Sequence, residues 1–100
     1  MPSYKIQIEQ RALLDIRQAC NYYEEQQPGL GVRFNQSVFH SFDALSNNPF
    51  YQVRYDSFRC LPVKKFLYMI HFEVDETNGI VIVYAVINTK LDPAKNWPLS

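Results

Sequence analysis

The spacing of hydrophobic residues changes along the chain, and each spacing predicts one kind of element. In residues 4–8 apolar and polar side chains alternate, with Tyr4, Ile6 and Ile8 on one side, which is typical of a short, half-buried strand. From residue 10 to about residue 27 the apolar side chains recur at intervals of three and four, which predicts a helix with one apolar face. Pro28 and Gly29 end this helix.

A second helix is predicted after this break. Apolar side chains return at helical spacing from Phe34 to Leu45. Asn47, Asn48 and Pro49 follow, and they end the helix because asparagine favours turns and proline disfavours a helical residue before it. The two helices are therefore expected to form a hairpin.

The rest of the chain is predicted to form strands. Residues 53–55 and 58–60 are two short amphipathic strands joined by a turn, and a long strand follows at residues 66–74. A loop at residues 75–79 ends in Asn78-Gly79, which favours a hairpin, and residues 80–87 return as the partner strand. One face of the long strand is expected to carry Phe66, Tyr68, Ile70, Phe72 and Val74.

Helices in the first half and strands in the second predict an α+β fold. It consists of an N-terminal strand, a helical hairpin and then an antiparallel sheet with both helices on one face. The other face of the sheet is expected to be free for binding. Residues 1–100 are predicted to form a single domain, because this length supports one hydrophobic core, and residues 91–100 form a C-terminal tail that contains Trp97.

The composition limits the possible functions. An apolar fraction of 47% with 15% aromatic residues is too hydrophobic for a disordered chain. The formal net charge is zero, with 10 basic and 10 acidic residues, which argues against binding nucleic acid through a broad positive surface. Residues 51–71 nevertheless carry a local net charge of +3, from Arg54, Arg59, Lys64 and Lys65 against Asp56.

The sequence shows no sign of a metal site, a cofactor or a membrane segment. Cys20 and Cys60 lack a CxxC spacing and are expected to be reduced, partly buried thiols of a cytoplasmic protein. His40 and His71 have no further ligand at metal-binding spacing, which argues against zinc. No secretory signal is visible, and no apolar stretch reaches the roughly 18 residues of a membrane span.

Several segments occur in an order and spacing that resemble one known family. They are Ala12-Leu13-Leu14-Asp15-Ile16 with Tyr22-Tyr23, the helix from Phe34 through Leu45 to Pro49, the strands Val53-Arg54-Tyr55 and Phe58-Arg59-Cys60-Leu61, and the closing hairpin of Phe66-Leu67-Tyr68-Met69-Ile70-His71-Phe72 with Ile80-Val81-Ile82-Val83-Tyr84-Ala85-Val86. Together they resemble the RelE/ParE superfamily, the toxins of bacterial type II toxin–antitoxin systems. The resemblance covers nearly the whole chain.

The resemblance implies a toxin that is neutralised by a cognate antitoxin. Toxins of the RelE type cut messenger RNA on the ribosome without a metal ion, whereas those of the ParE type poison DNA gyrase. Ribosome-dependent mRNA cleavage is the first expectation for this chain. ParE-like inhibition of gyrase, and an inactive toxin fold that serves only as a binding partner, are the alternatives.

Metal-free RNA cleavage needs a base, a cation that stabilises the charged phosphorane and an acid. The resemblance places Arg59 as the strand arginine that contacts phosphate, with Lys65 and Lys90 as further catalytic cations. Arg54 and Lys64 are expected to bind RNA or the ribosome. A structural interpretation is equally available, in which the arginines are exposed strand residues and the lysine pair only keeps a turn soluble.

The end of the last strand departs from the family pattern. Many relatives have a histidine and then an arginine after the Ala-Val of this strand. Here Asn88 stands at the expected histidine, and asparagine cannot act as a general base near neutral pH. Lys90 supplies a charge in place of the arginine.

Overall fold

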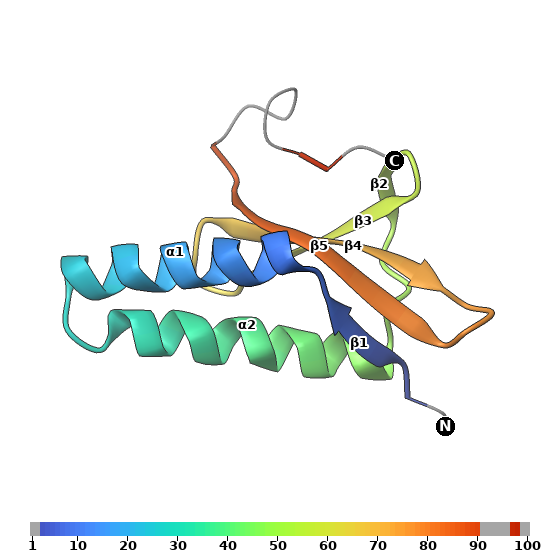
Figure 1. The fold of residues 1–100 in the computed structure, drawn as a ribbon, viewed down its shortest axis with the longest axis horizontal. Helices are drawn as coiled ribbons and strands as arrows, with labels where there is room; N and C mark the ends of the chain where they lie inside the picture. Colours follow the sequence, from blue (N-terminus) through green and yellow to red (C-terminus); the bar gives the residue numbers. More distant parts are fainter. Residues whose placement is uncertain (1–2, 91–96, 99–100) are drawn as a thin grey trace.

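The computed structural model describes residues 3–90 and 97–98. Within them, two helices form one layer and a five-stranded sheet forms the other, which confirms the predicted α+β fold (Figure 1). The elements are β1 (Lys5–Ile8), α1 (Gln10–Gln26), α2 (Leu30–Asn47), β2 (Val53–Tyr55), β3 (Phe58–Pro62), β4 (Tyr68–Asp75) and β5 (Ile80–Asn88). No helix in these residues has the length and hydrophobicity needed to cross a membrane. Most of the predicted tail, residues 91–96 and 99–100, lies outside the described residues.

The sheet has the strand order β1-β5-β4-β3-β2. β2, β3, β4 and β5 pair antiparallel, as predicted, but β1 pairs parallel to β5, with Lys5 opposite Ile80 and Ile8 opposite Val83. The sequence did not predict this parallel pair, because strand periodicity carries no information about the partner. The first strand thus protects the edge of the last one.

The observed elements lie where they were predicted, but some boundaries differ. α2 begins at Leu30 instead of residue 34, β3 extends to Pro62 instead of residue 60, and β4 begins at Tyr68 instead of residue 66. Residues 63–67 form a turn, in which the Phe66 N–H donates to the Val63 carbonyl (3.0 Å) and the Val63 N–H donates to the Tyr68 carbonyl (2.9 Å). Lys65 adopts a left-handed conformation with φ 72°. Phe66 therefore belongs to the turn, although its side chain still packs against the core.

The hydrophobic core lies between the helices and one face of the sheet, which we call the inner face. The predicted apolar face of the long strand contributes to it, so the assignment of faces is confirmed. Ring contacts join α1 and α2 to the turn and to β4, since Tyr23 and Phe34 each lie about 5 Å from Phe66 and 5.2–5.9 Å from Tyr68. Fully buried core residues from the two layers are Ala12, Phe34, Val38, Leu45, Ile70, Phe72, Val81 and Val83.

The turn between the helices is held by one carboxylate. Glu24, near the end of α1, accepts hydrogen bonds from the backbone N–H groups of Gly29 (2.8 Å) and Gly31 (3.0 Å), which are otherwise unsatisfied donors at the start of α2. Gly31 also permits a close approach of the helices, because a Cβ there would lie only 2.5 Å from the Cys20 carbonyl oxygen. Gly29 supplies the left-handed residue of the turn, with φ 89°.

We expect Glu24→Ala to lower the free energy of unfolding by about 1–2 kcal/mol, the usual effect of losing a helix cap. Urea unfolding followed by circular dichroism measures this change. Glu25→Ala is the matched control, since Glu25 is exposed on the same turn of α1, and it should change stability by less than about 0.5 kcal/mol. Equal effects of the two substitutions would contradict a capping role for Glu24.

Candidate functional site

The arginine expected to contact phosphate lies on the inner side of the sheet. Arg59 alternates with Phe58 and Cys60 and shares its face with Leu61, which packs against the core. Its guanidinium carbon lies 5.4 Å from the centre of the Phe50 ring, and its Nε is buried without a hydrogen-bond partner among the described residues. A cation over an aromatic ring contributes about 0.5–1 kcal/mol at an exposed site. This placement favours a structural role for Arg59, although its Nε is buried and the residue is not the exposed strand residue that the structural interpretation expected.

Arg54 lies on β2, the strand paired with β3, and its side chain is exposed. Its charge acts on His71 and on Cys60, which belong to the opposite face of the sheet from Arg59. Although they are only five positions apart, Arg54 and Arg59 thus act on different faces of the sheet. The structure does not bring them together around one phosphate.

The three predicted lysines gather at one end of the sheet. Lys64 and Lys65 occupy the turn between β3 and β4, and both are exposed. Lys90 follows β5 at the same end, because the N–H of its neighbour Thr89 donates to the carbonyl of Leu67 in that turn (2.9 Å). Of the five predicted site residues, these three therefore share a region of the surface.

The face of the sheet turned away from the helices, which we call the outer face, was predicted to be free for binding. This prediction is wrong, because the centre of the face is covered. Cys60, His71 and Ala85 are buried on it, with at most 6% of each residue exposed. Aromatic rings from β2, β3, β5 and the C-terminal segment cover its centre: Tyr55 stacks on Phe58, Phe58 contacts Tyr84, and Trp97 contacts Tyr55 and His71. The sequence indicated alternation on these strands but not what would cover the polar side chains between them.

His71 is the centre of this outer cluster. Its Nδ1 lies 2.9 Å from the Tyr55 hydroxyl oxygen and 3.5 Å from the Cys60 Sγ. Burial, together with the charges of Arg11 and Arg54, lowers the pKa of His71 to about 4. A neutral ring that is unprotonated at Nδ1 accepts one hydrogen bond there, and the nearer Tyr55 hydroxyl is placed to donate it.

The outer cluster is poorly suited to catalysis. Burial raises the pKa of the Cys60 thiol, so the thiolate nucleophile is disfavoured at neutral pH. Burial and the neighbouring Glu73 raise the pKa of Tyr84 to about 12. A histidine that is 1% exposed has no access to a substrate proton. The cluster instead forms a second, smaller core, and both cysteines are free thiols.

Asn88, at the position of the expected histidine, has a structural role at the end of β5. Its side-chain oxygen accepts a hydrogen bond from the Lys90 N–H (2.8 Å), and its side chain also hydrogen-bonds Tyr68. A small cavity of about 300 Å³ lies beside it, between α1 and the end of β5. Asp15 lines this cavity and accepts a hydrogen bond from the Val86 N–H (3.0 Å), which ties α1 to β5.

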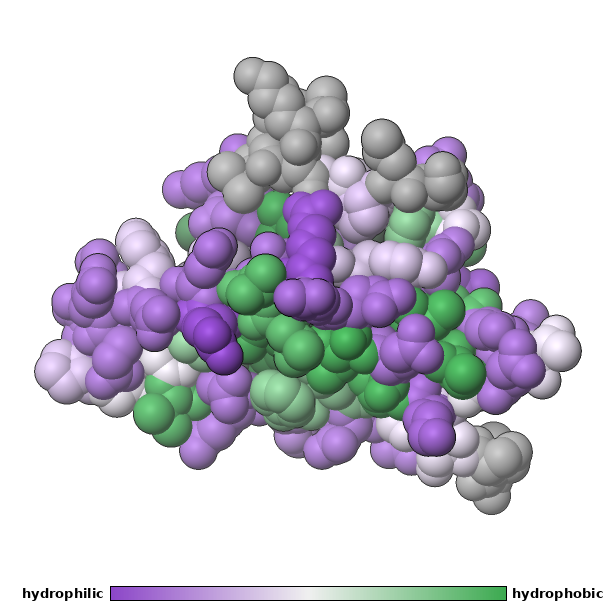
Figure 2. Space-filling model, in the orientation of Figure 1, coloured by the Kyte–Doolittle hydropathy of each residue, from purple (hydrophilic) through white to green (hydrophobic). Residues whose placement is uncertain are grey.

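A groove of about 600 Å³ lies between α1 and α2, on the side of the helices away from the sheet. Leu13, Val32 and Phe39 line it and are 43–58% exposed, so the groove is an apolar surface that no other described residue covers. Figure 2, which faces this side, shows hydrophobic residues gathered across the helical layer. The side of this groove on α1 is formed by Leu13, Ile16 and Cys20, which recur at the helical spacing predicted from the sequence. The predicted apolar face of α1 therefore lies partly on the groove, and periodicity did not indicate that Leu13 would be exposed.

Within residues 3–90 and 97–98, no group of three or more His, Cys, Asp or Glu side chains is placed to hold a metal ion.

Comparison with solved structures identifies the arrangement of helices and strands. A chain of the chromosomal ParDE toxin–antitoxin system from P. aeruginosa superposes with a TM-score of 0.75 at 12% sequence identity, over 88% of this chain and 98% of that chain. A chain of the RelBE2 toxin–antitoxin complex from Mycobacterium tuberculosis gives a TM-score of 0.61 at 16% identity, over 88% and 93% of the two chains. No protein-family model matches the sequence, and a search of curated proteins finds no match.

We expect acid to destabilise the fold through His71. Its pKa is lower in the folded chain than the value of about 6.5 in an unfolded one, so stability is complete above that pH and is lost as the pH falls towards 4. The loss between pH 7 and pH 5 should reach about 2 kcal/mol. In urea unfolding at the two pH values, His71→Gln should remove most of this difference, whereas His40→Gln on the exposed side of α2 should retain it. A wild-type pH dependence in His71→Gln would show that other groups cause the loss.

Proposed function

Because the chain has the fold of RelE and ParE toxins, we propose that it is the toxin of a toxin–antitoxin pair and that a small antitoxin protein holds it inactive. The observation that carries this proposal is the apolar groove on a fold whose solved relatives come from toxin–antitoxin systems. An isolated chain has no physical reason to leave three large apolar side chains exposed side by side, since their burial is favourable.

The antitoxin contributes an apolar segment to the groove. Leu13 and Phe39 approach it from α1 and α2, and the polar side chains of Arg17, Asn21 and Asn35 also line it. An apolar centre with a polar rim is the usual construction of a protein interface. A helix laid along the two-helix surface through side chains spaced three and four positions apart fits such a groove.

The target of the toxin is the second part of the proposal. Cleavage of RNA requires a base, a cation and an acid around one phosphate. Among the described residues, Arg59 packs on Phe50, Arg54 serves the other face, and His71 is buried and neutral. This arrangement supports inhibition by binding, in the manner of ParE on DNA gyrase, because such inhibition needs no catalytic set.

Ribosome-dependent mRNA cleavage is the second candidate. The observation in its favour is that Lys64, Lys65 and Lys90 share one end of the sheet, where several cations could stabilise a developing phosphorane charge. In that case another group must supply the base, because Asn88 stands where the histidine was expected and hydrogen-bonds its own strand end.

Expression from a tightly controlled bacterial promoter tests the function. Growth should stop, and co-expression of the adjacent small reading frame should restore it. Incorporation of labelled thymidine should fall before that of labelled amino acids if gyrase is the target, and the reverse order would support mRNA cleavage. Unimpaired growth, with soluble folded protein present, would contradict a toxin and leave a binding partner with a toxin fold.

Substitution in the groove tests the position of the antitoxin. Leu13→Glu should weaken antitoxin binding at least about tenfold, because a charge would replace an apolar contact at the centre of the interface. The variant should still arrest growth but no longer be rescued. Leu14→Glu is the matched control, since Leu14 is 46% exposed but lies outside the groove, and it should be rescued like the wild type. Full rescue of Leu13→Glu would place the antitoxin elsewhere.

A further inference from the structure

A second hollow, which we call the basic cleft, lies between α2 and the turn that joins β3 to β4. Its volume is about 470 Å³. α2 contributes Arg33 and His40, and the turn contributes Lys64 and Lys65. The other lining residues are Leu30, Gln36, Ser37, Ser41 and Phe66. Residues that are about 30 positions apart in the sequence thus form one positive surface.

The charge of the basic cleft is not compensated locally. No aspartate or glutamate lines it. Among residues 3–90 and 97–98, the one direct ion pair joins Arg11 to Asp15, so Arg33, Lys64 and Lys65 have no acidic partner there. In a chain with zero net charge, three neighbouring unpaired cations create a local positive potential that attracts an anion.

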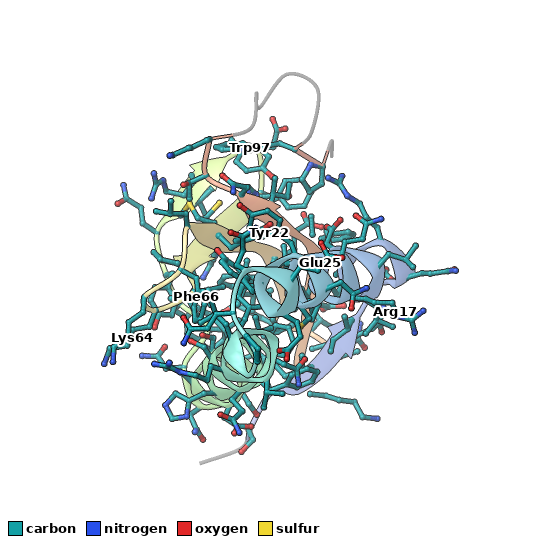
Figure 3. The ribbon with its side chains drawn as sticks, turned by 90° about the vertical axis from the view of Figure 1, so that its left-hand side faces the viewer. Arg17, Tyr22, Glu25, Lys64, Phe66 and Trp97 are labelled. Atoms are coloured by element: carbon teal, nitrogen blue, oxygen red, sulfur yellow. The ribbon has the colours of Figure 1, made fainter. Side chains whose placement is uncertain are left out.

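Hydrogen bonds fix the turn against α2. The Ser37 hydroxyl donates to the Lys64 carbonyl (3.1 Å), and the Ser41 hydroxyl donates to the Ser37 carbonyl (2.9 Å). Phe66 anchors the turn from the other side by packing on the Phe34 ring at 5.0 Å. Figure 3 shows Phe66 directed towards the helices and Lys64 directed outward. The lysines are therefore held beside Arg33, which reduces the conformational cost of binding a ligand to all three.

Lys65 has a backbone conformation that lysine rarely adopts. Its φ of 72° lies in the left-handed region, which costs a residue with a side chain about 1 kcal/mol relative to glycine. Glycine at this position would fit the turn better than lysine does. Replacing Lys65 by glycine is thus a way to lower the positive charge of the cleft by one without destabilising the fold.

The lining of the basic cleft distinguishes it from the apolar groove. Only Leu30 and Phe66 are apolar, so the cleft lacks the cluster of hydrophobic anchors on which protein partners depend. Arginine binds phosphate through two parallel hydrogen bonds, and lysine binds it as a point charge. Several separated cations match the regularly spaced phosphates of a nucleic acid strand.

We propose that the basic cleft binds the sugar–phosphate backbone of a nucleic acid strand, with Arg33, Lys64 and Lys65 each contacting phosphate. RNA and DNA offer the same phosphodiester chemistry, and the test separates them. The site goes beyond inhibition of gyrase by binding, and it adds Arg33 of α2 to two lysines that the resemblance already suggested as RNA contacts. Binding by the purified chain requires neither growth arrest nor an antitoxin, so the two proposals can fail independently.

Fluorescence anisotropy of the purified protein with a short labelled single-stranded RNA, and with DNA of the same sequence, measures the binding over a series of salt concentrations. Arg33→Gln combined with Lys64→Gln should weaken binding about tenfold. The slope of log affinity against log salt should become shallower by about 0.7 for each cation removed. Lys65→Gly should also weaken binding while it retains or raises the urea midpoint of unfolding.

Lys5→Gln is the matched control. Lys5 is an exposed lysine on β1, at the edge of the sheet, and its loss removes one positive charge, as Lys65→Gly does, without touching the cleft. This variant should bind like the wild type. A preference for RNA or for DNA would support the proposal and identify the strand. Wild-type affinity in both cleft variants would overturn it, as would equal binding of a labelled polyglutamate peptide, which would make the cleft a site for acidic protein segments.

Discussion

The packing of α1 and α2 against a single face of the sheet is the constraint on which every surface of this protein depends. Phe34 of α2 is fully buried, and its ring contacts Tyr23 of α1, Phe66 of the turn and Tyr68 of β4. Burial of one such ring contributes about 2 kcal/mol. The same contacts fix the two helices relative to the turn at residues 63–67. The groove, the cleft and the core therefore all depend on the packing of Phe34.

The strands distribute charge between the two faces of the sheet. Because successive side chains of a strand point to opposite sides, Arg59 is directed to the inner side, where Phe50 covers it, while its neighbours face the outer cluster. The outer face then closes over a neutral histidine and a thiol with aromatic rings from Tyr55 and Trp97. A zero net charge is thus compatible with a positive local surface, because three exposed cations, Arg33, Lys64 and Lys65, lie together beside the turn and α2 with no acidic residue lining their cleft.

The apolar groove and the basic cleft occupy opposite flanks of α2. Arg17 beside the groove and Lys64 beside the cleft project to opposite sides of the helical pair (Figure 3). A protein segment in the groove and a nucleic acid strand in the cleft would therefore bind α2 from two sides. On this geometry, an antitoxin seated only in the groove leaves the cleft open.

The order of the elements was determined by the sequence, because periods of two and of three to four depend on local backbone geometry alone. The helical hairpin, the closing hairpin of β4 and β5 and the apolar face of β4 were predicted on this basis. Of the candidate site residues, Lys64, Lys65 and Lys90 were correctly expected at the ends of strands. Their common location required the hydrogen bond from Thr89 to Leu67, which joins distant segments.

Tertiary structure alone decided the parallel pairing of β1 with β5, the covering of the outer face and the meeting of Arg33 with the lysine turn. Each of these depends on contacts between residues far apart in the chain, which a local period cannot specify. The same holds for Arg59, whose residue type suggested phosphate binding. Its position on β3, opposite Phe72 of β4, directs its side chain towards Phe50. A side chain's chemistry can be read from the sequence, whereas the surface on which it acts is set by the packing of the layers.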